Sequence, residues 1–400
     1  MGRRRDEILE RAGKLPELRG LAEAFPVALK AQGARIFDVD NVGYIDYVAG
    51  GGSAIFGYAN QYILDAVKKV VTSGIPRGLH TQMEVELAET LQQFLPWTET
   101  LYFSQNEGAA TQQALDLARS ITGKERFLAL DGGRLFEMGP DLPAESRRIR
   151  KLPGWNLDKV EAALTAGASK IAALIIDPLM SGGGLIPAPE GALKHLAEVC
   201  THYGVLLILD ERISGFRLAR GGAAEWAEIV PDIAIYGDGL GGGYPLGVVA
   251  LSRSIRETES KPATGRAPHL ISLGAAEAVL SILKNDSVFV RLEERCTQLV
   301  EGILSLAERF SRSMRVNRIG SVFSIYFTRA DEVSTLAGAL ESDEASYQRL
   351  ATGLRAEGVL LPSEPLQPTF VSSAHSAKDI DETLEAFERV LMRLHQEDLP

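Results

Sequence analysis

Apolar and polar residues alternate in two short stretches near the start of the chain. Residues 34–39 (Ala-Arg-Ile-Phe-Asp-Val) and residues 43–47 (Gly-Tyr-Ile-Asp-Tyr) flank the pair Asp40-Asn41. A period of two residues is typical of β-strands that bury one face, and an Asp-Asn pair between two such runs is typical of a turn. The pattern therefore predicts a β-hairpin in an N-terminal arm that spans residues 1–60.

The pattern changes between about residue 80 and residue 250, where short apolar runs alternate with stretches long enough to form helices. This alternation predicts a parallel sheet with crossover helices packed on it. We expect this large α/β domain to span residues 61–260 and to bind its ligand at the strand ends. The expected strands are residues 100–103, 127–130, 172–176, 205–209, 233–236 and 247–251.

The last third of the chain mixes helices and strands in a different order. A long helical pattern covers about residues 270–311, strands are expected near 314–328, and helices near 343–356 and 377–395. This order predicts an interface helix and a smaller α+β domain over residues 261–400. The chain has no long Gly/Ser linker, so we expect its parts to pack rigidly.

Composition narrows the classes of function. The 400 residues are 45% hydrophobic and 24% charged, with a formal net charge of −11, which argues against nucleic-acid or anionic-membrane partners. No apolar run suggests a signal peptide or a spanning helix, so a cytoplasmic location is the default expectation. Cys200 and Cys296 are too few for a disulfide framework, and the six histidines lack metal-ligand spacing, so we expect no metal.

Candidate chemistry gathers after two of the expected strands. The strand at residues 205–209 leads into Asp210-Glu211-Arg212, followed by Gly215-Phe216-Arg217. About twenty residues later, Pro231-Asp232 precedes another strand, which ends in Gly237-Asp238 and a glycine-rich turn reaching Gly247. This order of motifs resembles the class III aminotransferases of fold type I. Glutamate-1-semialdehyde aminomutases are the most similar members, through residues 38–47, 357–363 and 372–381.

The resemblance covers nearly the whole chain and implies the fold: a fold type I aminotransferase-like α/β protein, with a mostly parallel central sheet, flanking helices and a smaller α+β C-terminal domain. It also implies a homodimer. In this family a lysine holds pyridoxal phosphate (PLP) as an imine. Asp238 stands at the matching position, so the chain is expected to hold no covalently bound cofactor. Asp210 keeps the position of the carboxylate that pairs with the pyridine nitrogen of the cofactor.

The resemblance places other residues of this chain where the family has different ones. Asn106-Glu107-Gly108 match a Ser-Gly-Thr turn that binds the phosphate, Arg134 stands where an aromatic ring stacks on the pyridine, and His269 begins the segment that matches the partner subunit's threonine. A carboxylate at Glu107 would repel each phosphate charge by about 4 kcal/mol at 4 Å in a half-screened site. PLP or pyridoxamine phosphate (PMP) is therefore not expected to bind tightly.

The altered site is expected to be acidic, with Asp238, Asp210 and Glu211 as acid/base candidates. Arg134 and Arg212 are expected to neutralise part of this negative charge. Such a pocket suits a cation or a zwitterion, so the expected ligand is a small amine or amino acid. Plainer interpretations stay open. Asp238 could be only a turn residue between two glycines, and Asp210 could only cap the loop after a buried strand. Arg217 could form a structural ion pair with Glu211 or Asp210.

Three functions remain compatible with the sequence. The first is a derived enzyme that acts on a small amine or amino acid without a lysine imine, either cofactor-free or with PMP loosely held. The second is a non-catalytic protein: either a pseudoenzyme that forms a heterodimer with an active paralogue, or a binding protein that retained the fold. The third is an ordinary aminotransferase or aminomutase that uses another lysine, such as Lys261. The fold alone does not decide between them.

Overall fold

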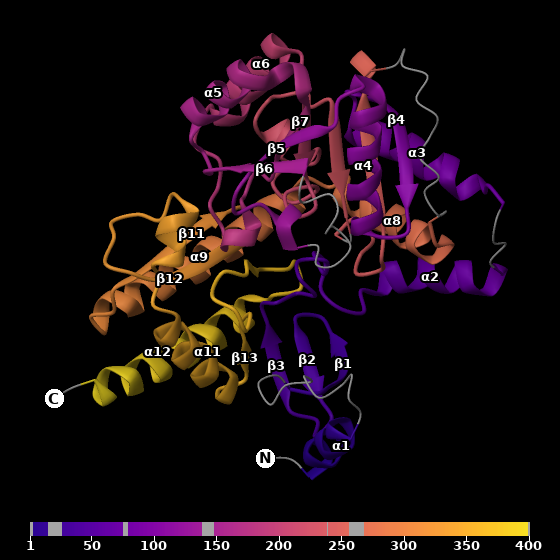
Figure 1. Ribbon diagram of the computed structural model, residues 1–400. Helices are drawn as coiled ribbons and strands as arrows, with labels where there is room; N and C mark the ends of the chain where they lie inside the picture. The colour runs from indigo at the N-terminus through magenta and orange to yellow at the C-terminus, as the bar shows by residue number, and fades with distance from the viewer. Residues whose placement is uncertain are drawn as a thin grey trace.

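A seven-stranded sheet forms the centre of the computed structural model, which describes residues 3–14, 26–74, 79–137, 148–237, 239–255 and 268–398 (Figure 1). The strand order is β4-β10-β9-β8-β7-β5-β6. The strands are β4 (Thr98–Ser104), β5 (Arg126–Leu130), β6 (Ile149–Leu152), β7 (Ile171–Ile176), β8 (Leu206–Asp210), β9 (Ile233–Tyr236) and β10 (Gly247–Ser252).

Most neighbouring strands of this sheet run parallel. The pairs β5·β6, β5·β7, β7·β8 and β8·β9 are parallel, whereas β10 runs antiparallel to both β9 and β4. The prediction of a mostly parallel central sheet is therefore confirmed. Strand β6 was not predicted, because it is short and carries the exposed pair Arg150-Lys151 at its centre, as suits an edge strand.

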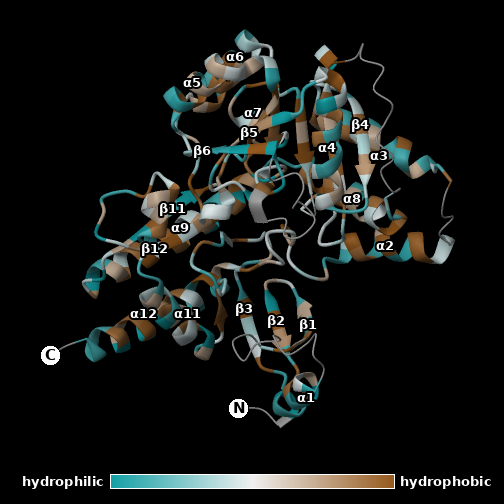
Figure 2. Cartoon of the chain, viewed as in Figure 1, coloured by the Kyte–Doolittle hydropathy of each residue, from teal (hydrophilic) through white to brown (hydrophobic). Residues whose placement is uncertain are grey.

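Successive residues of the central strands pack on opposite faces of the sheet, as the strand period requires. On one face, Phe127, Ile175 and Ile208 pack with apolar residues of α4 (Glu107–Thr122). On the other face, Leu128 and Leu209 join a larger cluster that includes residues of three helices. These helices are α5 (Leu157–Gly167), α6 (Ala192–Tyr203) and α8 (Leu270–Leu283). In Figure 2 several strands of this sheet carry the brown of hydrophobic residues, whereas the edge strand β6 is teal.

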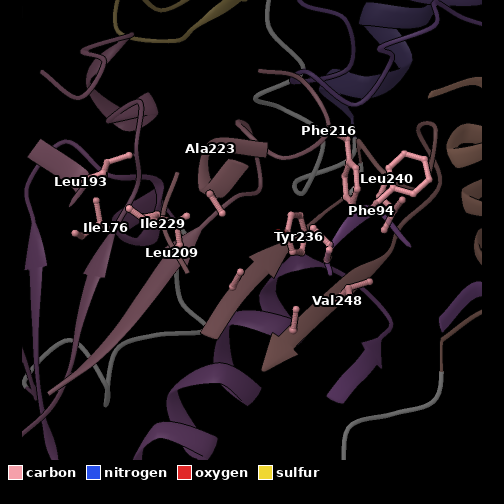
Figure 3. Close-up of a cluster of buried hydrophobic side chains, with 14 of the residues drawn as sticks. Phe94, Ile176, Leu193, Leu209, Phe216, Ala223, Ile229, Tyr236, Leu240 and Val248 are labelled. Carbon is pink, nitrogen blue, oxygen red and sulfur yellow. The ribbon is translucent and has the colours of Figure 1, made fainter. Parts of the chain in front are cut away.

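A tight aromatic contact lies beside the carboxyl end of β8. Figure 3 shows Phe216 and Tyr236 in the buried cluster with Phe94, and the Phe216 and Tyr236 rings have centroids 5.0 Å apart. A Cβ on Gly215 would lie 2.6 Å from Cδ1 of Tyr236 and 2.5 Å from the carbonyl oxygen of Glu211. Glycine is therefore required in this turn, which brings the loop after β8 against β9.

The predicted N-terminal hairpin is confirmed as β2 (Arg35–Asp38) and β3 (Gly43–Asp46), and β1 (Ala28–Gln32) extends it. Beyond it, β13 (Val359–Leu360) from the C-terminal part pairs in parallel with β3. Figure 1 shows this small sheet below the central one, with β13 beside β3. The hairpin is a local pattern, whereas the pairing with β13 joins residues that are far apart in the sequence.

The C-terminal part contains a three-stranded antiparallel sheet of β11 (Met314–Ile319), β12 (Val322–Phe327) and β14 (Thr369–Phe370). The helical pattern expected over about residues 270–311 is confirmed, and the structure divides it into two helices, α8 and α9 (Ser287–Arg309). Asn285 interrupts the helical pattern, and its side chain accepts a hydrogen bond from Ser287 N at 3.1 Å.

The remaining helices complete the layers around these sheets. In the C-terminal part, α12 starts with a capping box formed by Ser376 and Asp379. The part of the chain that the structure describes contains no helix long and apolar enough to cross a membrane. The other helices are α1 (Arg3–Gly13), α2 (Gln61–Ser73), α3 (Gln82–Phe94), α7 (Gly222–Trp226), α10 (Leu336–Leu340), α11 (Glu344–Ala356) and α12 (Ala377–Glu397).

A buried histidine joins the N-terminal sheet to the C-terminal part. The His375 ring stacks on Tyr47 with centroids 4.6 Å apart, and its Nδ1 accepts a hydrogen bond from Ser372 N at 3.0 Å. Burial lowers the pKa of His375 to about 4, although the Asp379 carboxylate partly opposes this change. The folded protein therefore keeps this ring neutral until the solution is strongly acidic.

We expect the free energy of unfolding to fall as the pH falls from 6.5 toward about 4. In this window the unfolded chain binds a proton that the folded site excludes, so stability is present above pH 6.5 and lost toward the folded pKa. The difference between the two pKa values corresponds to about 3 kcal/mol. Urea unfolding of the wild type and of His375→Asn across this range measures it. Parallel stability curves for the two proteins would contradict the assignment.

Candidate functional site

Charged side chains converge at the carboxyl edge of the central sheet. Asp210 is the last residue of β8, and Asp177 directly follows β7. Arg134 begins the short 3-10 helix η2 (Arg134–Glu137) after β5, and Glu107 begins α4 after β4. Because these strands point the same way, their ends meet at one edge, where ligands bind in sheets of this kind.

The central contact of the site is an ion pair between Asp210 and Arg212. Arg212 donates from Nε to Oδ1 at 2.7 Å and from Nη2 to Oδ2 at 2.6 Å, so the pair is bidentate. Their side chains are only 2% and 3% exposed, respectively. Burial alone lowers the pKa of Arg212, but Asp210, followed by Glu107 and Asp177, raises it above its usual value. The guanidinium of Arg212 therefore stays charged, and its bidentate contact with Asp210 offsets the desolvation of the buried pair.

Asp177 belongs to the same cluster and was missed at the level of sequence. Its carboxylate accepts hydrogen bonds from Leu179 N, from Ser181 N and Oγ, and from Arg134 N, at 2.7–3.2 Å. Burial raises the pKa of Asp177, and the neighbouring charge of Asp210 raises it further. The signal was present, since Asp177 ends an apolar strand in the same way as Asp210.

Glu107 lies against the backbone of Gly237, the residue after β9. A Cβ built on Gly237 would lie 2.1 Å from Oε1 of Glu107, so this carboxylate packs directly on the glycine backbone. Nη2 of Arg134 lies 3.7 Å from Oε2 of Glu107, which gives the carboxylate a cationic neighbour. Asp238 and the alternative lysine, Lys261, lie outside the described residues, but Gly237 directly precedes Asp238.

The first turn of α4 lies at this same edge. Asn106 is its N-cap and accepts a hydrogen bond from Ala109 N at 2.9 Å, while Glu107 and Gly108 form the first helical residues. Helix N-termini present N–H groups that lack partners within the helix and attract anions. The turn thus keeps the backbone of an anion site, with one amide already capped by Asn106.

Glu211 is adjacent to Asp210 in sequence but serves another part of the fold. Its carboxylate accepts hydrogen bonds from Ala223 N at 2.9 Å, from Ala224 N at 2.8 Å and from Ser214 Oγ at 2.5 Å. These contacts hold the start of α7. Burial raises the pKa of Glu211 to about 7, while the three hydrogen bonds oppose the rise. Its role as an acid/base candidate stays a prediction.

Two further residues lie apart from the acidic cluster. Arg217 donates to the carbonyl oxygens of Ile213 and Gly52 and to Ser321 Oγ, so the interpretation as an ion-pair partner of Glu211 or Asp210 is wrong. Burial lowers the pKa of Arg217 to about 10. His269 is exposed and caps α8, its Nδ1 accepting from Ile271 N at 3.4 Å. A ligand-binding role for His269 stays a prediction.

Comparison of the chain with known proteins assigns it to one family. The model of the class III aminotransferases matches residues 20–133 and 144–391. The chain belongs to this family. Among curated relatives, glutamate-1-semialdehyde 2,1-aminomutase of Fusobacterium nucleatum is 31% identical over 392 residues, covering 91% of this chain and 89% of the relative. The resemblance to these aminomutases is therefore supported.

Solved structures share the fold at low sequence identity. The PLP internal aldimine form of the FumI protein from Sphingopyxis sp. MTA144 is 24% identical and superposes with a TM-score of 0.87, covering 99% of this chain and 97% of that one. A lysine-to-alanine variant of a glutamate-1-semialdehyde aminomutase from Pseudomonas aeruginosa PAO1, in complex with PMP, is 20% identical with a TM-score of 0.86, covering 98% and 94%. These matches confirm the fold type I aminotransferase-like architecture.

The expectation that PLP or PMP is not tightly bound is contradicted by these relatives. The FumI protein contains PLP, the aminomutase variant contains PMP, and the whole family match points to PLP as the cofactor. The structure also weakens the electrostatic objection to a phosphate. Arg134 stands beside Glu107, so the carboxylate that was expected to repel the phosphate is partly compensated.

The residues present fit the two ends of such a cofactor. Asp210 offers a buried carboxylate for a protonated ring nitrogen, and the N-terminus of α4 together with Arg134 offers hydrogen-bond donors for a phosphate. One contact competes with this fit, because Arg212 already donates to both oxygens of Asp210.

We expect Glu211→Ala to lower the free energy of unfolding by about 3 kcal/mol, because the hydroxyl and the two amides that Glu211 binds lose a buried acceptor. Urea unfolding measures this change. Glu198→Ala is the matched control, since Glu198 is exposed on α6, and it is expected to change stability by less than about 0.5 kcal/mol. Equal stability of the two variants would show that Glu211 does not hold α7.

Proposed function

We propose that this chain is an aminotransferase- or aminomutase-like enzyme that acts on a small amine or amino acid and holds PLP or PMP by non-covalent contacts. The observation that carries the proposal is the Asp238 that follows Gly237, at the position where the resemblance to the family places the Schiff-base lysine. Family membership supports the cofactor and the reaction class. The lysine-to-alanine variant of an aminomutase, which is in complex with PMP, supports binding of this form of the cofactor.

Each residue of the site has a role under this proposal. When bound, the cofactor supplies an electron sink for bonds at the carbon that carries the amine. Asp210 holds the proton on the ring nitrogen, while the α4 N-terminus and Arg134 bind the phosphate. Asp238 is the candidate to hold and return the proton at the reacting carbon, the task that the lysine performs in the family.

The expected substrate follows from the charges. A small amino acid carries both an ammonium and a carboxylate, which match a site that contains acidic side chains and arginines.

We also infer a homodimer from the family, with the start of α8, including His269, near the partner subunit's site. Light scattering of the purified protein tests this dimer, and a monomer at micromolar concentration would count against it.

We expect the wild-type protein, after removal of any cofactor, to bind PLP and PMP saturably without forming a link that borohydride can reduce onto the protein. Asp238→Lys is the matched variant. It is expected to gain a borohydride-reducible link with PLP, which mass spectrometry detects as one added pyridoxyl group. Failure of both proteins to bind either cofactor would overturn the proposal.

Amino-group transfer from a panel of small amino acids, measured with the wild type loaded with PLP, tests the enzymatic half of the proposal. Turnover above the rate of free PLP supports an enzyme. Saturable binding without turnover, combined with a mixed dimer on co-expression with a lysine-bearing relative, would instead favour the non-catalytic partner.

A further inference from the structure

A basic cavity lies at the amino edge of the central sheet. Its volume is about 830 Å³. The lining includes the first residues of three parallel strands, which are Arg126 of β5, Ile149 of β6 and Ile171 of β7. The acidic cluster of the candidate site lies at the carboxyl edge of the same sheet. The cavity is therefore a separate feature, on the opposite edge from the candidate site.

The strand register brings arginines from neighbouring strands together in this cavity. Arg150 of β6 pairs with Leu128 of β5, and Arg126 lies two positions before Leu128. Side chains two positions apart on a strand point to the same face, so Arg126 and Arg150 share one face of the sheet. Arg148 directly precedes β6 and lines the same cavity.

Small residues on the facing helix leave room for a ligand above these arginines. The end of α5 contributes Ala163, Ala166 and Gly167 to the lining. Lys170, from the short 3-10 helix η5 (Ala168–Lys170), adds a further cation beside them. The volume of the cavity is typical of pockets that bind small molecules.

The cavity has a large excess of positive charge. Four cationic side chains and one acidic side chain line it, which leaves three formal positive charges; the cations are Arg126, Arg148, Arg150 and Lys170. The acidic residue, Glu125, forms an ion pair with Arg148, and its Oε2 also lies 3.8 Å from Nε of Arg119. Among the residues that the structure describes, none forms an ion pair with the other three cations. The sign of the charge is locally reversed, because the whole chain has a net charge of −11.

Protection of the sheet edge explains only part of this charge. Cations on an edge strand prevent pairing with another chain, and Arg150 on β6 fits that role. Arg126 does not fit it, because β5 lies between β6 and β7. Lys170 lies outside the sheet. The convergence of these cations on one cavity is better explained by an anionic ligand.

We propose that this cavity binds a small molecule that carries at least two phosphate groups. One phosphate group carries a charge of about −1.5 to −2 at neutral pH, so two groups match the three formal positive charges. Guanidinium groups bind phosphate oxygens through paired N–H donors, and Lys170 supplies a point charge. The site goes beyond the proposed function, since it shares no residue with the cofactor site.

Calorimetry of the full-length protein with inorganic pyrophosphate, at constant ionic strength, tests the site. We expect saturable binding, and we expect inorganic phosphate to bind at least about tenfold more weakly because it carries fewer charges. The cavity variant, Arg126→Gln with Arg150→Gln, is expected to bind pyrophosphate about tenfold or more weakly than the wild type. Unchanged affinity in this variant would overturn the site.

A control variant measures the effect of net charge alone. Lys69→Gln with Arg291→Gln removes the same charge from exposed positions on α2 and α9, which do not line the cavity. Its pyrophosphate affinity is expected to stay within about twofold of the wild-type value, because salt screens distant charges. Equal weakening in the control and cavity variants would show only diffuse attraction of anions and would overturn the site.

Pyrophosphate could instead bind where the cofactor phosphate is expected. Arg134→Gln alters that position, and it is expected to leave pyrophosphate binding at the cavity unchanged. Loss of binding in Arg134→Gln, together with full binding in the cavity variant, would place the anion at the carboxyl edge and refute the proposal.

Thermal melts show whether the cavity variant is folded and whether it responds to the anion. A ligand that binds the folded state raises the melting temperature, so saturating pyrophosphate is expected to raise that of the wild type but not that of the cavity variant. An equal rise in both proteins would contradict the site.

PMP titrations separate this inference from the proposed function. The cavity variant is expected to bind PMP as the wild type does. A wild type that binds PMP but not pyrophosphate overturns this inference alone. A wild type that binds pyrophosphate at the cavity but neither PLP nor PMP overturns the proposed function alone.

Discussion

Burial of several carboxylates at one edge of the central sheet is the constraint on which the rest of the site depends. Asp177 and Asp210 end neighbouring strands, and the first turn of α4 adds Glu107. Such charges are tolerated only when cations and N–H groups neutralise them. This neutralisation comes from Arg212, from Arg134 and from the loop after β7. Their positions therefore depend on the carboxylates that they contact.

Asp210 and Glu211 are adjacent in sequence but have different contacts in the fold. Asp210 is the last residue of β8, whereas Glu211 and Arg212 lie in the loop that follows, where their side chains contact different parts of the fold. Asp210 therefore lies in the charged cluster, and Glu211 binds the start of α7. Gly215 allows this loop to press against Tyr236, which fixes both carboxylates relative to the sheet.

Membership of the class III family explains the framework, and the changed residues explain why this site differs from it. Glu107, Arg134, Asp210 and Arg212 are charged residues at one edge of the central sheet. Their charges are mutually compensating: Arg212 is ion-paired with Asp210, and Arg134 lies beside Glu107. The site is therefore best described as a network of mutually compensating charges.

The sequence by itself determined the local elements and their order. Periodicity located the hairpin and six strands of the central sheet, and the motif order pointed to the family and to Asp238, because these signals lie within short segments. Only the tertiary structure decided that Arg212 binds Asp210, that Glu107 packs on Gly237, that Asp177 joins the cluster and that β13 pairs with β3. Most of these contacts join residues distant in the chain, and the choice of partner for a buried charge depends on which neighbours the fold brings within reach.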